Sequence, residues 1–181
     1  MQRMIHQLSM VLVPLMLHVS APWCWAGFDE GANAYARGDY PTAMREWLPL
    51  AQQGDTYAQY GLGLMYYKGH GVPQDYGQAA QWFRRVADHG HAEAQAALGL
   101  MYALGRGVPQ DVVQAYLWLT LAAARLPPGT EHDDAVRARD TVAQGMTPAQ
   151  LAQGQERART WQPKPETPGD RRAAPHHDSP P

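Results

Sequence analysis

The chain has 181 residues, enough for one domain, and its 15 Lys and Arg against 17 Asp and Glu give a formal net charge of −2. This balance leaves no excess of positive charge that could hold nucleic acid or an anionic membrane surface. Neither is therefore expected as a partner.

Residues 1–26 have the pattern of a secretory signal peptide, with a cationic start, an apolar stretch over residues 8–19 and an acidic, soluble sequence after Ala26. A membrane anchor is the alternative. A span needs about 18 uninterrupted apolar residues, however, and polar residues and Pro14 interrupt this stretch. We expect cleavage after Ala26, no stable membrane span in the mature chain, and a periplasmic or secreted product.

Residues 27–54 are expected to form the first helix pair of the mature chain. Six residues stand at spacings that recur later in the sequence: Asp39, Tyr40, Ala43, Trp47, Ala51 and Gly54. The connection between the two helices is shorter here than in the later units. We therefore interpret this segment as an N-terminal opening unit.

Residues 55–90 and 91–126 carry the same pattern twice, at a period of 36 residues. Self-similarity at such a period is typical of a solenoid, in which each unit buries its apolar face against its neighbours. The shared positions are therefore interpreted as scaffold. Functional residues are expected mainly among the positions that differ.

Each of these repeats is expected to hold two antiparallel helices. The first helix has apolar residues at i, i+4, i+7 and i+8, the spacing of one buried stripe: Ala58, Leu62, Met65 and Tyr66, then Ala94, Leu98, Met101 and Tyr102. Gly69 and Gly105 fit left-handed residues that end a helix, and the Val-Pro that follows prevents its continuation. Asp75 and Asp111, each three residues before a Gln, fit N-caps of the second helix, close to a capping box.

The second helix of each repeat is expected to supply a matching inward face. Its members are Ala79, Trp82, Phe83 and Ala87, repeated as Ala115, Trp118, Leu119 and Ala123. Trp82 and Trp118 recur at the period of the unit, so both are assigned to packing. Gly63 and Gly99 are small enough to permit close contact between helices.

Residues 127–162 are expected to close the array with a capping helix pair. The first helix runs from about residue 131 to 143, and the second begins at Thr147, which combines with Pro148 and Gln150 as N-cap, N1 and N3 residues. Residues 163–181 hold six prolines and no other apolar side chain larger than Ala. We expect this tail to be disordered, because it cannot bury enough surface to offset the entropy of ordering.

The string A-x-A-Q-x-x-L-G-L-M-Y-x-x-G-x-G-V-P-Q-D-x-x-Q-A-x-x-W at residues 92–118, nearly repeated at 56–82, resembles the Sel1-like repeat, a relative of the tetratricopeptide repeat. The resemblance implies an all-α fold, a right-handed α-solenoid of about four antiparallel helix pairs, with residues 27–54 closer to a tetratricopeptide repeat. It further implies an exported bacterial adaptor, expected to be a monomer, that binds another protein or peptide without catalysis.

In tetratricopeptide repeats the first helix of each pair lines the concave groove, and the resemblance implies the same orientation here. The candidate groove residues are Tyr57, Tyr60, Leu64, Tyr67, Lys68, Glu93, Ala96, Leu100 and Leu104. Tyrosines are stiff and amphipathic, which suits them to interface hot spots. The alternative is that these side chains only pack between adjacent helix pairs, above all at Tyr60 and Leu64.

Catalysis is not expected, because the mature chain has no cysteine and its one serine, Ser179, lies in the tail. Some cysteine-rich members of the Sel1-like repeat family are described as β-lactamases that bind penicillin, and a hydrolase of that kind is the alternative function that the resemblance implies. Those relatives carry a cysteine pair in each repeat, which this chain lacks. Three histidine clusters lack the spacing of a closed metal site, so no metal or other cofactor is expected: residues 89–91, 132–134 and 176–178.

Overall fold

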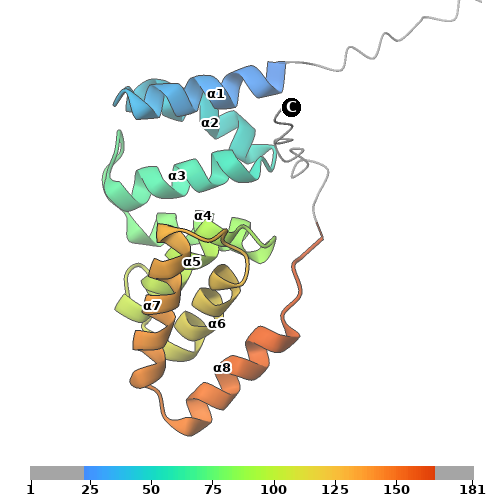
Figure 1. Ribbon diagram of the computed structural model, residues 1–181. Coiled ribbons are helices and arrows are strands. Elements are labelled where there is room, and N and C mark those ends of the chain that lie inside the picture. The colour runs from blue at the N-terminus through green and yellow to red at the C-terminus, as the bar shows by residue number, and fades with distance from the viewer. Residues whose placement is uncertain (1–22, 166–181) are drawn as a thin grey trace, which may run out of the picture.

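The computed structural model describes residues 23–165, and this part of the chain forms eight α-helices and no strand (Figure 1). The helices are α1 (Trp23–Ala36), α2 (Tyr40–Gln52), α3 (Thr56–Lys68), α4 (Tyr76–Asp88), α5 (Ala92–Leu104), α6 (Val112–Ala123), α7 (Thr130–Gln144) and α8 (Pro148–Thr160). The expected all-α stack of helix pairs is confirmed. The first 22 residues, which hold most of the expected signal peptide, and residues 166–181 of the expected tail lie outside the described part.

The helices pack in chain order, α1 on α2, α3 on α4 and α5 on α6, and α2 on α3 and α4 on α5 join these pairs into a stack. The buried residues of the predicted stripe are Ala58, Leu62, Met65, Ala94, Leu98 and Met101. Tyr66 and Tyr102 are only partly buried and pack at the edge of the core. The aliphatic part of the predicted stripe is thus confirmed.

Small residues on the first helices receive large side chains from the second helices. A Cβ atom on Gly63 would lie 2.5 Å from the ring of Phe83, and one on Gly99 would lie 2.8 Å from Leu119 Cγ. Trp47 occupies the same kind of space beside Gly61. The close helix contact expected at Gly63 and Gly99 is confirmed, because any side chain at these positions would overlap the packed neighbour.

The predicted helix ends of the two repeats are confirmed. Gly69 and Gly105 end α3 and α5 in the left-handed conformation, with φ of 72° and 65°. The side chain of Asp75 accepts a hydrogen bond from the Gln78 amide at 2.9 Å, and Asp111 caps α6 in the same way. A full capping box forms at α8, between Thr147 and Gln150.

Gln59 and Gln95, which stand at the same position of the two repeats, have a structural role that the sequence did not predict. Gln59 Nε2 donates to the carbonyl oxygen of Ala51 at 3.0 Å, and Gln95 Nε2 donates to that of Ala87 at 3.1 Å. Both glutamines are buried. Each one satisfies a carbonyl near the end of the preceding helix, where helices leave such groups unpaired.

The loop inside each repeat closes on the preceding helix pair. His70 stacks on Tyr40, with ring centroids 4.4 Å apart, and Arg106 lies over Tyr76 at 5.7 Å. Gly107, at φ 69°, brings the loop so close that a Cβ atom there would overlap the backbone carbonyl of Tyr76. The second glycine of the G-x-G-V-P segment is therefore required by this contact between neighbouring repeats.

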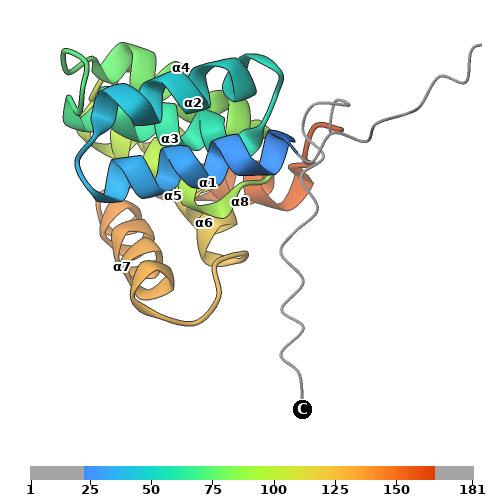
Figure 2. The same cartoon turned by 90° about the horizontal axis from the view of Figure 1, so that it is seen from above.

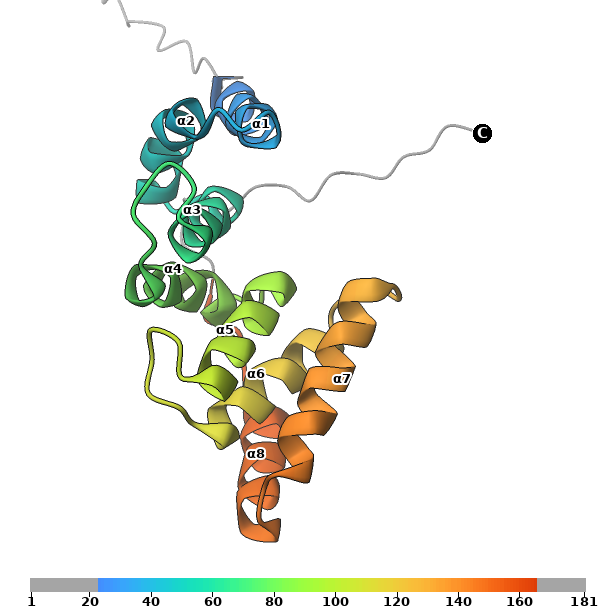
Figure 3. The same ribbon diagram turned by 90° about the vertical axis from the view of Figure 1, so that its left-hand side faces the viewer.

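The C-terminal helices differ from the expected capping pair. Helices α7 and α8 each pack against α6, and they diverge from one another along their lengths (Figures 2 and 3). Because α6 has apolar residues on more than one side, including Leu117 and Leu121 as well as Leu119, it must be covered from two directions. At the C-terminal end of the array, α7 and α8 thus pack on two separate faces of α6.

Residues after α8 return to the middle of the stack. Trp161 packs edge-on against Trp118, with ring centroids 6.2 Å apart. The Lys164 amide donates to the Asp88 carbonyl oxygen at 2.8 Å, and Lys164 Nζ lies 2.5 Å from the Asp88 carboxylate. The tail was expected to be disordered from residue 163, yet Lys164 is bonded to the end of α4.

Trp82 is a second difference from expectation. Trp118 is 3% exposed, because Trp161 covers it. Trp82 is only partly buried, and the guanidinium of Arg85 lies 4.6 Å from its ring centroid. The two tryptophans share a position in the repeat, but only the later one receives a cover from the C-terminal segment. Packing therefore fixes Trp118 far more than Trp82.

Candidate functional site

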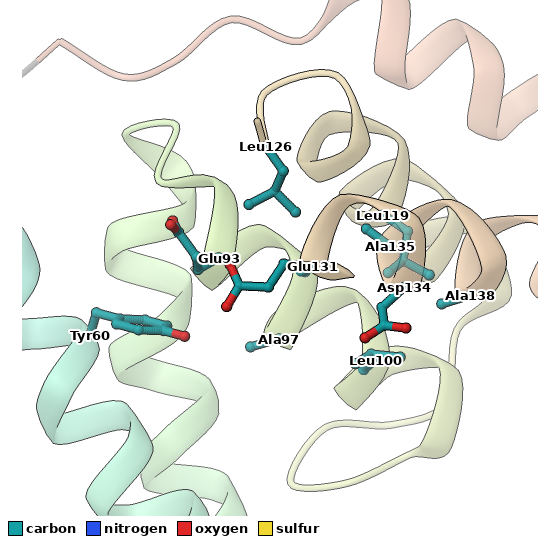
Figure 4. A pocket seen from close by; sticks show the side chains of 11 residues that line it. Tyr60, Glu93, Ala97, Leu100, Leu119, Leu126, Glu131, Asp134, Ala135 and Ala138 are labelled. Carbon is teal, nitrogen blue, oxygen red and sulfur yellow. The ribbon is translucent and has the colours of Figure 1, made fainter. Parts of the chain in front are cut away.

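A cavity of about 380 Å³ lies between α5 and α7, bounded by α3 on one side and by α6 and Leu126, three residues after the end of α6, on another (Figure 4). Its lining is mostly apolar, with one tyrosine and three carboxylates. The residues are Tyr60, Glu93, Ala96, Ala97, Leu100, Leu119, Leu126, Glu131, Asp134, Ala135 and Ala138.

The cavity exists because the second repeat carries a small residue where the first carries a large one. Ala96 stands 36 residues after Tyr60, at the same place in its helix. The ring of Tyr60 fills the space beside it by packing on Phe83 and His91, with centroids 5.6 and 4.9 Å apart. Ala96 leaves the equivalent space open in front of α7. Leu100, one turn further along α5, is 43% exposed and lines the opening.

Carboxylates gather at the side of the cavity nearest α3. Glu131 from the first turn of α7 points toward the region that the hydroxyl of Tyr60 also faces, and Glu93 from the first turn of α5 lies beside this region with its carboxylate turned away from Tyr60 (Figure 4). Burial, together with the negative charges of Glu93 and Glu131, raises the pKa of Tyr60 to about 12. This side of the cavity therefore has a negative potential.

The other charged groups near the cavity differ in how they are paired. Asp134 forms an ion pair with Arg137, one turn later on α7. Glu131 has no ion-pair partner within residues 23–165. No lysine, arginine or histidine of the described chain is among the residues that line the cavity.

His91 stands beside Glu93 and caps α5. Its Nδ1 accepts from the Ala94 amide at 3.4 Å and lies 3.2 Å from Glu93 Oε2. Burial lowers the pKa of His91, while the charge of Glu93 acts in the opposite direction. Accepting from an amide requires an unprotonated Nδ1, so the cap and the lowered pKa both favour neutral histidine. A neutral His91 therefore supplies no positive charge beside the Glu93 carboxylate.

The structure brings together four of the nine residues predicted for the groove, namely Tyr60, Glu93, Ala96 and Leu100. The remaining five do not line the cavity: Tyr57, Leu64, Tyr67, Lys68 and Leu104. Leu64 packs at the edge of the core, and Lys68 is exposed at the end of α3. Leu104 is 57% exposed at the end of α5.

Two of the predicted tyrosines have packing partners instead. Tyr67 accepts a hydrogen bond from Arg106 at 3.0 Å and packs edge-on against Tyr76, with centroids 5.2 Å apart. Tyr57 packs edge-on against Phe28 and against His91. Tyr67 thus belongs to the contact between repeats that His70 and Arg106 form.

Residues of the α7 wall were not predicted as part of the site. Glu131, Asp134, Ala135 and Ala138 all lie on one face of α7, at a spacing of three to four residues. This spacing was visible as a stripe of alanines with acidic residues beside it. The sequence did not indicate which neighbouring helix this stripe faces, because α7 lies outside the repeated part of the chain.

Histidines predicted as poor metal ligands have other contacts. His132 Nδ1 lies 3.1 Å from Asp133 Oδ1, and His89 Nδ1 lies 3.2 Å from the Lys164 carbonyl oxygen. Residues 176–178 are outside the described part of the chain. Within residues 23–165, no three His, Cys, Asp or Glu side chains are grouped so that they could hold a metal ion. In the same range, no helix has the length and apolar character needed to cross a membrane.

Comparison with known proteins gives a consistent assignment. The model of the Sel1 repeat family matches residues 56–91 and 92–125. A Sel1 repeat protein from Oxalobacter formigenes is 32% identical, with a TM-score of 0.56 over 65% of this chain and 88% of that one. A protective antigen of uropathogenic Escherichia coli, described as displaying an SLR fold, is 28% identical, with a TM-score of 0.69 over 76% of this chain. This chain spans 29% of the length of that antigen. No curated protein sequence matches the chain.

Proposed function

We propose that this chain, which belongs to the Sel1 repeat family, is a non-catalytic scaffold that binds a segment of another protein in the cavity between α5 and α7. Sel1 repeat proteins generally mediate protein–protein interactions, and their fold is typically a scaffold without catalytic activity. The observation that carries the proposal is the open apolar cavity formed where Ala96 replaces the large residue of the preceding repeat.

The size and lining of the cavity support this function. A volume of about 380 Å³ is within the range of about 300–1,000 Å³ that is usual for sites that enclose a compact ligand or a few side chains. Leu100 and Leu104 leave an exposed apolar strip on α5, which begins at the cavity and runs away from it. An extended or helical segment could thus anchor one side chain in the cavity and lay apolar neighbours along α5.

Site-specific crosslinking tests the proposal. A photo-crosslinking residue is placed at position 100 or, as a control, at the exposed position 78 on α4, and the protein is irradiated in cells that express it. We expect a discrete protein adduct from position 100 and none of the same mass from position 78. Ala138→Trp, which narrows the cavity from the α7 side, should reduce the yield of that adduct. Equal adducts from both positions would contradict the proposal.

We propose in addition that the chain is exported and that its mature form begins at Gly27. The support is the cationic start and the apolar stretch of residues 8–19. Helix α1 begins at Trp23, so cleavage after Ala26 would remove its first turn and leave the rest. Intact mass measurement of the protein recovered from a periplasmic extract tests this. A mass that still includes residues 1–26, or recovery only from the cytoplasm, would contradict export.

A further inference from the structure

We propose that the cavity between α5 and α7 selects a lysine or arginine side chain, presented by the bound protein with apolar residues on either side of it. This inference rests on the proposed function and adds the chemistry of the partner. The aliphatic stem would lie on Ala96, Leu100 and Ala138, and the cationic head would reach the carboxylates of Glu93 and Glu131. Basic side chains combine an apolar stem with a charged head in this way.

The cavity lining carries an unbalanced negative charge. The three acidic residues of the lining are not balanced by a basic residue of the lining within residues 23–165. Asp134 is already paired with Arg137, so the relevant charges are those of Glu93 and Glu131. Within residues 23–165, the ion-pair contact of Glu93 is with His91, which its cap and its burial keep neutral, and Glu131 has no ion-pair partner. Two carboxylates are therefore free to receive a cation.

Loss of water from the cavity carboxylates also favours a basic side chain. A bound segment would remove water from Glu93 and Glu131, and a carboxylate that loses water without gaining a partner is strongly disfavoured. A purely apolar side chain would impose this loss, and an acidic one would add repulsion. A lysine or arginine replaces the lost water with charge-assisted hydrogen bonds. The hydroxyl of Tyr60 faces the same region, so its oxygen would be a further acceptor for this cation.

The test uses a defined set of peptides. Four acetylated and amidated peptides of the form Ala-Leu-Xaa-Leu-Ala, with Xaa as Arg, Lys, Leu or Glu, are titrated into the isotopically labelled full chain and followed by amide chemical shifts. We expect the Arg and Lys peptides to shift the amides of Ala96, Leu100 and Ala138, with dissociation constants about tenfold below that of the Leu peptide. The Glu peptide should bind more weakly still. Added salt should weaken the Arg and Lys peptides most, because it screens charge.

Matched variants separate charge from folding. The double variant Glu93→Gln with Glu131→Gln should lose at least about tenfold in affinity for the Arg peptide and little for the Leu peptide. The control carries Glu30→Gln with Glu156→Gln, which removes two glutamates of α1 and α8 that form surface pairs. It should bind the Arg peptide within about twofold of the parent. Melting curves of both variants identify any loss that comes from unfolding.

Each result decides something different. If the Leu peptide binds in the cavity as tightly as the Arg peptide, the selection of a cation is wrong while the scaffold function stands. If no peptide shifts the cavity and position 100 gives no adduct, both proposals fail. If Arg171→Ala with Arg172→Ala changes the cavity amides without any peptide, the occupant is the tail of this chain, and the claim of a basic side chain from a partner is overturned.

Discussion

Substitution of Gly107 by alanine tests the contact that joins the two central repeats. Gly107 has φ 69°, and its loop closes on the start of α4. Gly38, between α1 and α2, has a similar φ of 79°, but nothing lies within 4 Å of the position where its Cβ would stand. The variants Gly107→Ala and Gly38→Ala therefore differ in the contact of the new methyl group and share a positive φ.

The structure allows the two effects to be separated in size. A left-handed conformation costs an alanine about 1–2 kcal/mol, partly offset because alanine also restricts the unfolded chain. Gly38→Ala should thus lower the free energy of unfolding by about 1 kcal/mol. At Gly107 the new methyl would overlap the carbonyl of Tyr76 and stand 2.6 Å from the amide nitrogen of Gly77. These are backbone atoms that cannot rotate away, so overpacking should raise the loss to about 3–4 kcal/mol.

Thermal unfolding followed by circular dichroism measures the difference. For a domain of this size, about 1 kcal/mol corresponds to about 2–4 °C in Tm. We expect a shift of a few degrees for Gly38→Ala and about 10 °C for Gly107→Ala. Hydrogen exchange should show the added loss in the loop after α5 and at the start of α4. Equal shifts for the two variants would refute the reasoning, since the loop would then not bear on α4.

Two further predictions concern stability. Trp118→Ala should lower the free energy of unfolding by about 3–5 kcal/mol and Trp82→Ala by about 1–2 kcal/mol, because Trp118 is buried and Trp82 is only partly buried. Urea titration measures both losses. Equal losses would contradict the conclusion that Trp118 is packed more fully than Trp82. Because burial holds the pKa of His91 below its usual value of 6.5, the unfolded chain takes up a proton there before the folded chain does. The contribution of His91 to stability should therefore be complete above about pH 6.5 and decline as the pH falls below it. His91→Asn keeps an N-cap acceptor and should remove this part of the pH dependence, and an unchanged pH profile would show that His91 is not its source.

The repeat itself could be predicted from the sequence because its determinants are local. Asp75, Gly69 and the Val-Pro that follows act within a few residues, and the stripe of Leu62 and Met65 has one helical period. Two copies of the pattern then fixed the spacing of the pairs. Such signals do not depend on how distant parts of the chain meet.

The C-terminal arrangement could not be predicted in the same way. Whether α7 and α8 pack on each other or on opposite sides of α6 depends on which faces of α6 remain uncovered, and no second copy of that segment exists for comparison. The return of Trp161 and Lys164 to Trp118 and Asp88 links residues more than 40 positions apart. A proline-rich composition predicted a free tail from residue 163, and the contacts of Lys164 differ from this prediction within the described residues 163–165.

The candidate site was accessible to sequence reasoning only on its repeated side. The repeat placed Tyr60 and Leu100 on the first helices, and both line the cavity. The sequence favoured packing for Tyr60 over Tyr67, whereas in the structure Tyr60 lines the cavity and Tyr67 contacts Arg106. Glu131 lies on the α7 wall, and its approach to Glu93 depends on the angle of a helix that the repeat does not determine.

The contact made by each repeat loop gives the solenoid a direction of growth. His70 and Arg106 each dock on an aromatic ring that opens the second helix of the unit before, Tyr40 or Tyr76. A new unit added at the C-terminal end would need the same ring on the last full repeat, and that position holds Val112. Each of the two loops within residues 55–126 therefore has an aromatic ring to dock on, whereas Val112 offers no such ring to the loop of a further repeat.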